Sequence, residues 1–428
     1  FFYTGGESVC EEHYSLIALS PEPSLHVHPD TLENPFTMLR NVLNCQSWGG
    51  SDRPPVPFIG GWVGYLTYDL AHWIERLDTS ARVDHSFPLM EFAFCRRILA
   101  YDHTHNTWTA IELLNEDTPP EETTKKLENL LNLIAGAPNP KRDHRPALSK
   151  DLQSNFSRKS YERNVQIILE HIANGDVYQV NFSQRFEGFL QISPEEMALR
   201  LLEINPEPFS AFLSFSNRAI VSSSPERFLR VHDRSVEAWP IKGTCPRGVA
   251  PEEDERFLEE LLASEKDRAE LIMITDLLRN DLGRVCIAGS VKVPELRKAV
   301  SHNNVHHTYS RVTGRLNPET DLIDLLQATF PGGSVTGAPK IKAMEIIEAL
   351  EPTTRGPYCG AIGYIGVDGT MDLNIAIRTV LCEGRRVTFQ VGGGIVAESR
   401  PSDEFEETHQ KAKGILKAFG INLDNFFK

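Results

Sequence analysis

The sequence has few of the residues from which disulfide frameworks and zinc sites are built. Its 428 residues include seven cysteines, and no two of them form a CxxC pair. An odd number at wide spacing is typical of thiols in a reducing compartment, so we expect a cytoplasmic protein. No cysteine lies in a glycine-flanked turn, which argues against a thiol-based glutaminase within this chain. The cysteines stand at positions 10, 45, 95, 245, 286, 359 and 382.

Long apolar runs are also lacking. A helix that spans a bilayer needs about 20 predominantly apolar residues, and the apolar stretches here are far shorter. The chain does not open with the basic and apolar segments of a secretory leader. It begins at Phe1 rather than at methionine, so a removed leader stays an open alternative. We therefore expect no membrane partner.

Positive charge is in the minority. The sequence has 44 Lys and Arg against 59 Asp and Glu, a formal net charge of −15 at pH 7. This excess of acid works against a nucleic-acid groove or an anionic membrane surface. Hydrophobic residues make up 40% and charged residues 24% of the chain, the profile of an ordinary globular protein. We therefore expect no nucleic-acid partner.

Apolar residues recur with the periods of strands and helices along the whole chain. Residues 1–115 alternate like strands separated by turns, and the proline-rich, charged stretch 136–150 is typical of a connection. We therefore expect an N-terminal subdomain, residues 1–150, and a second domain, residues 151–428. Runs of strands with helices clustered apart from them predict an α+β fold with antiparallel sheet. Helices are expected at 120–135, 158–174, 252–282, 339–350 and 402–419, and one strand through LNIAIRTV (373–380).

Two glycine-rich stretches suggest nucleotide loops but lack their other residues. FPGGSVTGAPK (330–340) has Ala338 and Pro339 where a phosphate-binding loop needs Lys followed by Ser or Thr. GGGIVA (392–397) is followed by Pro401 and a cluster of acids, where a helix N-terminus should meet a pyrophosphate. Both stretches are better interpreted as places where the backbone approaches a ligand or packs tightly.

Two predicted helices each carry a pair of acids three residues apart. Asp267 and Glu270 begin a stripe that continues into Ile274 and Leu278, which points them inward. Glu404 and Glu407 begin a similar stripe that continues through Lys411 to Ile415. Two converging acidic pairs repel each other unless a cation lies between them, and oxygen-only ligands favour Mg²⁺. The alternative is a pair of solvated faces, as in PEEDERFLEE (251–260).

Three single residues have settings that suit chemistry. Lys242 lies in WPIKGTCPRG, where partial desolvation favours the neutral amine, a nucleophile. Glu226, after a serine-rich strand end, could act as a general acid. Arg378 lies in an apolar strand pattern, and a buried arginine usually pairs with an internal or a substrate carboxylate. The alternative for Lys242 is a strand-end side chain that reaches solvent.

These residues belong to motifs that resemble a known family, the chorismate-utilising enzymes. The resemblance covers nearly the whole chain, strongly from 158 to 417, and implies two mainly antiparallel sheets in a layered core flanked by helices. It makes residues 151–428 a chorismate-binding catalytic domain. The motifs are GDVYQVNFSQ, SSSPERF, PIKGT, KDRAELIMITDLLRNDLGRV, FPGGSVTGAPKIKAMEIIEALEP, YCGAIGY and GGGIVAESRPSDEFEET.

The resemblance implies a role for each candidate residue. Glu270 and Glu407 would bind a Mg²⁺ ion that holds the ring carboxylate of chorismate, and Asp267 and Glu404 would support it. The second carboxylate would be held by Arg378, Tyr358 and backbone N–H groups near Gly393 and Gly394. Gly243 and Thr244 would line the site, and His307 matches the active-site histidine of the family.

Two positions distinguish branches of the family. Members that use water as the nucleophile carry a lysine where this chain has Gln179. Members that form anthranilate have a small residue at Lys242, whereas the branch that forms 4-amino-4-deoxychorismate has the lysine. We therefore expect amination of chorismate at C4, with Lys242 as nucleophile, Glu226 as acid and ammonia from a separate glutaminase subunit, in folate biosynthesis. The alternatives are an anthranilate-forming enzyme and a non-catalytic chorismate-binding paralogue. Tryptophan, which relatives bind near their N-terminus, is left open as a ligand.

Overall fold

The computed structural model describes residues 2–3, 13–19, 21–46, 48–50, 53–78, 80–114, 119–138, 142–143, 145–149, 151–301 and 305–421. Cys10 lies outside these residues, as does part of the N-terminal segment considered for tryptophan. The six cysteines that are described are all free. In the same residues, no helix is both long enough and apolar enough to cross a bilayer.

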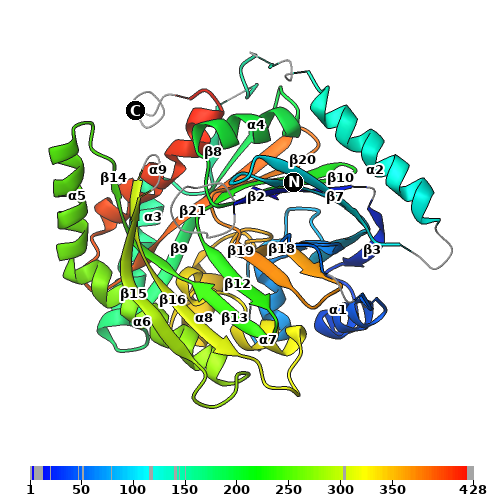
Figure 1. Ribbon diagram of the computed structural model, residues 1–428. Helices are drawn as coiled ribbons and strands as arrows, with labels where there is room; N and C mark the ends of the chain where they lie inside the picture. Colours follow the sequence, from blue (N-terminus) through cyan, green and yellow to red (C-terminus); the bar gives the residue numbers. More distant parts are fainter. Residues whose placement is uncertain are drawn as a thin grey trace.

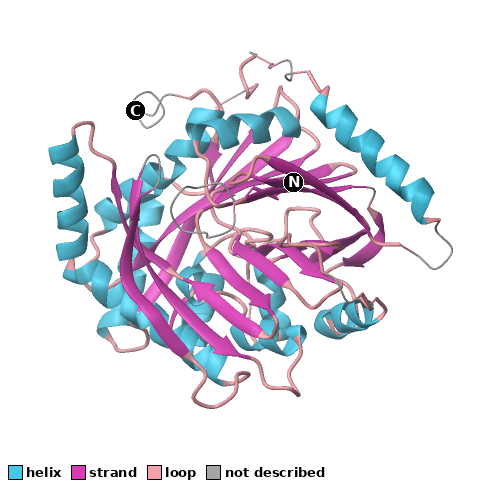
Figure 2. Ribbon diagram, in the orientation of Figure 1, coloured by secondary structure: helices cyan, strands magenta, loops and turns pink. Residues whose placement is uncertain are grey.

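Two antiparallel sheets, of eleven and ten strands among the described residues, form the centre of the molecule (Figure 2). The first sheet runs in the order β17 (Gly337–Ala338), β9 (Gln179–Phe189), β21 (Arg386–Ile395), β20 (Thr379–Glu383), β11 (Arg218–Ser224), β10 (Phe209–Phe215), β1 (Phe2–Tyr3), β2 (Tyr14–Leu19), β6 (Arg97–Asp102) and β7 (Thr107–Glu112), with β8 (Gln153–Ser154) beside β9. The second runs in the order β14 (Ile241–Pro246), β16 (Val305–Arg315), β13 (Ser235–Trp239), β12 (Arg227–His232), β19 (Met371–Ile375), β18 (Ala361–Gly366), β4 (Gly61–Leu66), β5 (Met90–Cys95) and β3 (Glu22–Val27), with β15 (Lys292–Ser301) beside β16.

The two sheets pack face to face through an apolar core to which both contribute. Leu16, Ile98 and Ile220 of the first sheet share this core with Tyr65 and Ile362 of the second. Helices cover the outer faces (Figure 1). This arrangement confirms the predicted α+β fold with a layered core. The helices are α1 (Pro35–Asn44), α2 (Pro120–Ala135), α3 (Arg158–Ala173), α4 (Pro194–Ile204), α5 (Pro251–Ala263), α6 (Glu265–Gly283), α7 (Leu322–Thr329), α8 (Lys340–Leu350) and α9 (Pro401–Ala418), with short 3₁₀ turns η1 (Tyr68–Trp73) and η2 (Gly333–Val335).

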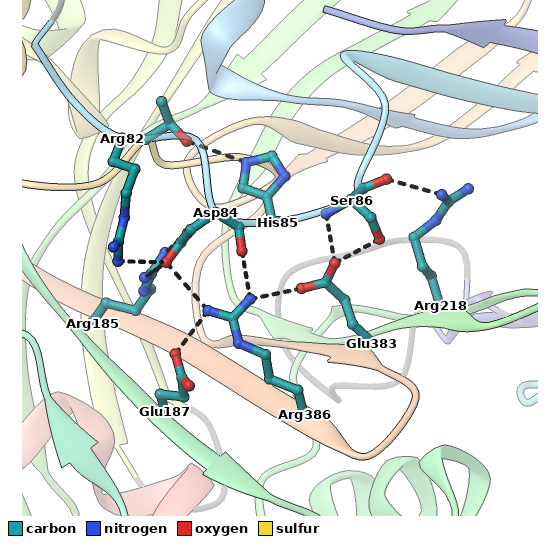
Figure 3. Close-up of polar contacts among 10 residues, drawn as sticks. Arg82, Asp84, His85, Ser86, Arg185, Glu187, Arg218, Glu383 and Arg386 are labelled. Carbon is teal, nitrogen blue, oxygen red and sulfur yellow. Dashed lines mark hydrogen bonds and ion pairs between the residues drawn. The ribbon is translucent and has the colours of Figure 1, made fainter.

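Both sheets contain strands from each side of residue 150. In the first sheet β1 pairs with β10, and in the second β4 pairs with β18. A polar network adds a further connection (Figure 3): the carboxylate of Asp84 accepts a 2.8 Å hydrogen bond from Nη1 of Arg185 in β9 and lies 3.3 Å from Nη2 of Arg386 in β21. Ser86 donates to Glu383 in β20 through its backbone N–H and its hydroxyl, each at 2.6 Å. The segment around 84–86 is thereby held to three strands of the first sheet.

Two predicted elements are each divided in the structure. The helix expected over 252–282 breaks at Ser264, whose extended backbone ends α5 and whose hydroxyl caps α6 by accepting a 3.2 Å hydrogen bond from the Asp267 N–H. The strand expected through 373–380 is also wrong. β19 ends at Ile375 in the second sheet, and β20 begins at Thr379 in the first.

Candidate active site

The glycines of GGGIVA lie within strand β21 rather than in a loop. Gly393 pairs with Phe182 and Gly394 with Asn181 across to β9. A Cβ on Gly393 would lie 3.1 Å from Oε2 of Glu404, and one on Gly394 would lie 2.9 Å from Nζ of Lys242. Because neither glycine has a side chain, Glu404 of α9 and Lys242 of β14 both approach the same stretch of the β21 backbone.

Lys242 lies at the centre of this region. It belongs to β14, and its Nζ atom is 3.2 Å from Oε2 of Glu270 in α6; the two side chains are 16% and 11% exposed. The alternative of a lysine that reaches into solvent therefore does not apply. On the next residue, Gly243, φ is +82°, and a Cβ would lie 3.1 Å from Cβ of Asp267. This glycine is needed for both its backbone angle and its close approach to α6.

The acids of α9 lie in contrasting surroundings. Glu404 is buried; its Oε1 atom accepts a 2.5 Å hydrogen bond from Ser399, and its Oε2 atom has no hydrogen-bond partner among the described residues. Burial, helped by the nearby charge of Glu407, raises the pKa of Glu404. Burial acts in the same direction on Glu407, but the ammonium groups of Lys411, which lies 2.7 Å away, Lys242 and Lys266 together outweigh it and lower the pKa of Glu407.

The four predicted metal ligands do not gather around a single point. Within the described residues, no three His, Cys, Asp or Glu side chains are close enough together to hold one ion. Glu270 is instead paired with Lys242, and Glu407 with Lys411. The donor set nevertheless suits Mg²⁺, which takes one or two carboxylates and keeps several waters. The unpartnered oxygen of Glu404 offers such a ligand beside Gly393.

Glu226 is buried just after the end of β11. Its Oε1 atom accepts a 2.7 Å hydrogen bond from the hydroxyl of Ser334 in η2. Burial raises the pKa of Glu226 to about 7, although Ser334, Lys242 and Arg378 act in the opposite direction. A carboxyl with this pKa can hold a proton and release it near neutral pH, as a general acid must.

Arg378 occupies the short connection in which the chain passes from β19 to β20. Its φ of +50° is in the left-handed region, which explains why no continuous strand runs through this residue as predicted. Its Nη1 atom donates to Oε1 of Glu207, a carboxylate that is only 3% exposed and whose pKa is raised by burial. The Arg378 side chain is 22% exposed. The guanidinium is therefore held from one side by Glu207 and reaches solvent-accessible space on another.

Of the remaining candidates, Thr244 follows Gly243 in β14 and Gln179 lies beside Gly394, whereas the contacts of Tyr358 are with Arg355. Thr244 pairs with His307 across β14 and β16, and its hydroxyl lies 2.7 Å from Nδ1 of His307. Tyr358 is buried, with the guanidinium of Arg355 5.8 Å from its ring, and burial raises its pKa well above the usual value. Gln179 is fully buried; its amide has no hydrogen-bond partner in the described part of the chain, and its Nε2 atom is 2.6 Å from the position of a Cβ on Gly394.

Two residues of the site were not among the predicted ones. Glu207 was missed because NPEPFS gives no sign that its acid faces inward, and its partner Arg378 is 171 residues away. Ser334 was not predicted because nothing in FPGGSVTGAPK distinguishes its serine, and the partner Glu226 is 108 residues away.

Comparisons with known proteins identify the family of this chain. A family model described as chorismate binding enzyme matches residues 8–417. Aminodeoxychorismate synthase component 1 of Escherichia coli is 39% identical over 387 residues, 90% of this chain and 83% of the relative. Anthranilate synthase component 1 of Bacillus subtilis is likewise 39% identical, over 406 residues, 91% of this chain and 79% of the relative.

A solved structure gives the same result for the fold. The crystal structure of anthranilate synthase component I from Streptococcus pneumoniae matches with a TM-score of 0.84 at 32% identity, covering 96% of this chain and 93% of that one. Family model, relatives and solved structure all extend over most of the chain. The chain therefore belongs to the chorismate-binding enzyme family, and within it to the component I type of anthranilate and aminodeoxychorismate synthases.

Proposed function

We propose that this chain aminates chorismate at C4 to give 4-amino-4-deoxychorismate, the reaction of an aminodeoxychorismate synthase component I on the route to p-aminobenzoate and folate. The observation that carries the proposal is the position of Lys242, whose Nζ atom lies beside Glu270 and above Gly394. Ammonia would come from a separate glutamine amidotransferase subunit, in agreement with the component 1 names of the relatives.

The competing function is that of an anthranilate synthase component I, because relatives with that name are equally similar. It would aminate chorismate at C2 and then eliminate pyruvate. An amine already positioned at the site, on Lys242, favours a reaction in which the protein itself occupies C2. The buried amide of Gln179, which cannot act as a base toward water, favours ammonia over water as the second nucleophile.

The first step uses Lys242 and Glu226. The neutral amine of Lys242 forms a bond to C2 of chorismate, the C1=C2 and C5=C6 double bonds shift to C1=C6 and C4=C5, and the C4–O bond breaks. Glu226 supplies the proton with which the hydroxyl leaves as water. The pKa of Glu226 near 7, set mainly by burial, keeps a substantial fraction of this carboxyl protonated for that purpose.

The second step restores the enzyme. Ammonia attacks C4, the double bonds return to their first positions, and the C2–N bond breaks, with its electron pair leaving on the Lys242 nitrogen. The new C4 ammonium returns a proton to the Glu226 carboxylate. The sum is chorismate plus ammonia giving 4-amino-4-deoxychorismate plus water, so atoms and charges balance.

The two carboxylates of chorismate require positive partners. Arg378, oriented by Glu207, would bind one of them, assisted by Tyr358 and by backbone N–H groups near Gly393 and Gly394. Glu270 and Glu407 would hold Mg²⁺, with Asp267 and Glu404 in support, and the bound ion would supply positive charge for the other carboxylate. Gly243, Thr244 and His307 would form the wall of the site opposite β21.

A product assay separates the two functions. The full chain is incubated with chorismate, ammonium chloride and Mg²⁺, without a glutaminase and without a lyase. We expect chorismate to be consumed and 4-amino-4-deoxychorismate to accumulate, with p-aminobenzoate appearing only after a lyase is added. Fluorescent anthranilate together with pyruvate would contradict the proposal, and no consumption of chorismate at saturating ammonia would favour a non-catalytic paralogue.

A further inference from the structure

The glycine-rich stretch 330–340 folds tightly beside Glu226. The Thr336 hydroxyl donates to the Gly332 carbonyl at 3.0 Å, and the Thr336 carbonyl accepts a 2.7 Å hydrogen bond from the Asn181 N–H of β9. The Val335 carbonyl accepts a 2.9 Å hydrogen bond from Arg355, whose side chain is only 2% exposed. Contacts on both of its flanks therefore fix the place of Ser334.

Ser334 is the residue of this stretch that contacts Glu226. The serine is 7% exposed and the glutamate 5%, and the serine Oγ atom lies 2.7 Å from Oε1 of the carboxyl. The two residues are 108 positions apart in the chain. A buried hydroxyl or carboxyl without a hydrogen-bond partner costs free energy. The Ser334 hydroxyl and the Glu226 carboxyl therefore fix each other's orientation.

We propose that Ser334 is the positioning residue of the general acid: it aims the carboxyl of Glu226 at the leaving hydroxyl and stabilises the carboxylate that remains after the proton has left. The inference rests on the acid role of Glu226 in the proposed function. It also assigns a role to the glycine-rich stretch 330–340, which lacks the residues of a nucleotide-binding loop.

The electrostatics of the pocket explain why such a donor is needed. Proton delivery leaves a negative charge in a buried position, where an unsatisfied carboxylate is strongly disfavoured. Lys242 from β14 and Arg378 from the β19–β20 connection supply positive charge nearby, the backbone N–H of Ile241 supplies a hydrogen bond, and Cys359 is the further titratable neighbour. The Ser334 hydroxyl contributes a side-chain hydrogen bond that favours the charged form.

Removing the hydroxyl should therefore change the pH dependence as well as the rate. In Ser334→Ala the carboxylate loses a donor, so the acid form of Glu226 persists to higher pH. We expect kcat to fall about tenfold near neutral pH. We also expect the alkaline limb of the kcat/KM profile for chorismate to move upward by about one pH unit.

The test follows chorismate consumption by the full chain with saturating Mg²⁺, at constant free ammonia across the pH series. Ser334→Thr keeps the hydroxyl and should hold the limb near its wild-type position. Thr67→Val removes a buried hydroxyl that bonds the Leu89 carbonyl at 2.8 Å rather than the Glu226 carboxyl, and should leave the limb unmoved. If Ser334→Ala does not fold, Ser334→Cys keeps a small side chain with a weak donor and should give an intermediate shift.

The outcomes also separate this inference from the proposed function. A lower rate for Ser334→Ala at every pH, with the limb unmoved, would show a merely structural serine and overturn the inference. If the alkaline limb of the kcat/KM profile survives in Glu226→Gln, Glu226 is not the general acid, and the inference is refuted as well. Formation of anthranilate by the wild type, with the limb still shifted in Ser334→Ala, would refute the product assignment and leave the positioning role standing.

Discussion

The Nζ atom of Lys242 lies 3.2 Å from Oε2 of Glu270, and both side chains are largely buried. The Glu270 carboxylate therefore has two partners. It forms an ion pair with Lys242 in the structure, and it is a proposed ligand of Mg²⁺. A cation bound by Glu270 would compete with Lys242 for that carboxylate. Nucleophile and metal site are thus coupled through a single side chain.

The first prediction concerns Glu270. Glu270→Gln removes the negative charge but keeps the size of the side chain. We expect chorismate consumption to fall about 100-fold, because removing one partner of a buried charge pair leaves the other uncompensated. We also expect the Mg²⁺ dependence of the residual activity to disappear.

Mg²⁺ titrations of activity and calorimetry with Mg²⁺ alone measure these two effects. Glu265→Gln is the matched control, since Glu265 begins the same helix but its side chain is 79% exposed. A wild-type Mg²⁺ affinity in Glu270→Gln would remove this residue from the metal site.

A second prediction concerns Gly394. The Cβ of Gly394→Ala would lie 2.6 Å from the Gln179 amide and 2.9 Å from Nζ of Lys242, both too close, so the lysine has to move. We expect kcat to fall about 100-fold, since a displacement of about 1 Å can cost that much. Gly283→Ala, where the Cβ meets nothing within 4 Å, should retain wild-type activity. Equal kinetics for the two variants would show that Lys242 needs no fixed position.

A third prediction separates binding from positioning at Arg378. Arg378→Ala should lower kcat/KM for chorismate by about 100-fold, through loss of a charge-assisted contact with a carboxylate. Glu207→Gln keeps a hydrogen-bond acceptor for Arg378 and should raise KM by less than that, with kcat nearly unchanged. Steady-state kinetics with varied chorismate give both values. A KM in Arg378→Ala equal to that of the wild type would exclude the arginine from substrate binding.

A fourth prediction concerns stability and its pH dependence. Burial alone would raise the pKa of Asp84, but the guanidinium groups of Arg185 and Arg386 hold that pKa below its usual value. A carboxylate with a lowered pKa stabilises the fold above its unfolded pKa of about 4, and this contribution is lost as the pH falls through the folded pKa. We expect Asp84→Asn to lower the free energy of unfolding by about 3 kcal/mol at neutral pH.

Urea unfolding followed at neutral and at acidic pH tests this expectation, and the difference from wild type should shrink in acid. Asp276→Asn is the control, because the Asp276–Arg279 ion pair has both side chains more than half exposed and should contribute less than about 1 kcal/mol. A loss in Asp84→Asn no larger than in this control would show that the network in Figure 3 does not hold the segment in place.

The sequence was informative where chemistry and spacing act locally. The i, i+3 acids fall on real helices, and the stripe below Asp267 and Glu270 is buried at Ile274 and Leu278 as predicted. This prediction succeeds because a helix face depends on neighbours within a few residues. The strand end expected at Lys242 lies instead at Trp239, the last residue of β13, and Lys242 is the second residue of β14.

The failures have physical causes of other kinds. The acidic pattern of 252–282 continues through Ser264, although that residue ends one helix and caps the next. The alternation through Arg378 continues across the point where the chain changes sheets. Glu207 and Ser334 act on partners more than a hundred residues away, and a single sequence gives no sign of such pairs.

Attack of the Lys242 amine on chorismate is tested most directly by intact-mass spectrometry of the full chain with chorismate and Mg²⁺, with ammonia withheld. We expect an added mass equal to chorismate minus water on the wild type, absent from Lys242→Ala and discharged when ammonium is added. A wild-type protein that consumes chorismate once ammonium is present, yet shows no such addition when it is withheld, would contradict the nucleophilic role of Lys242.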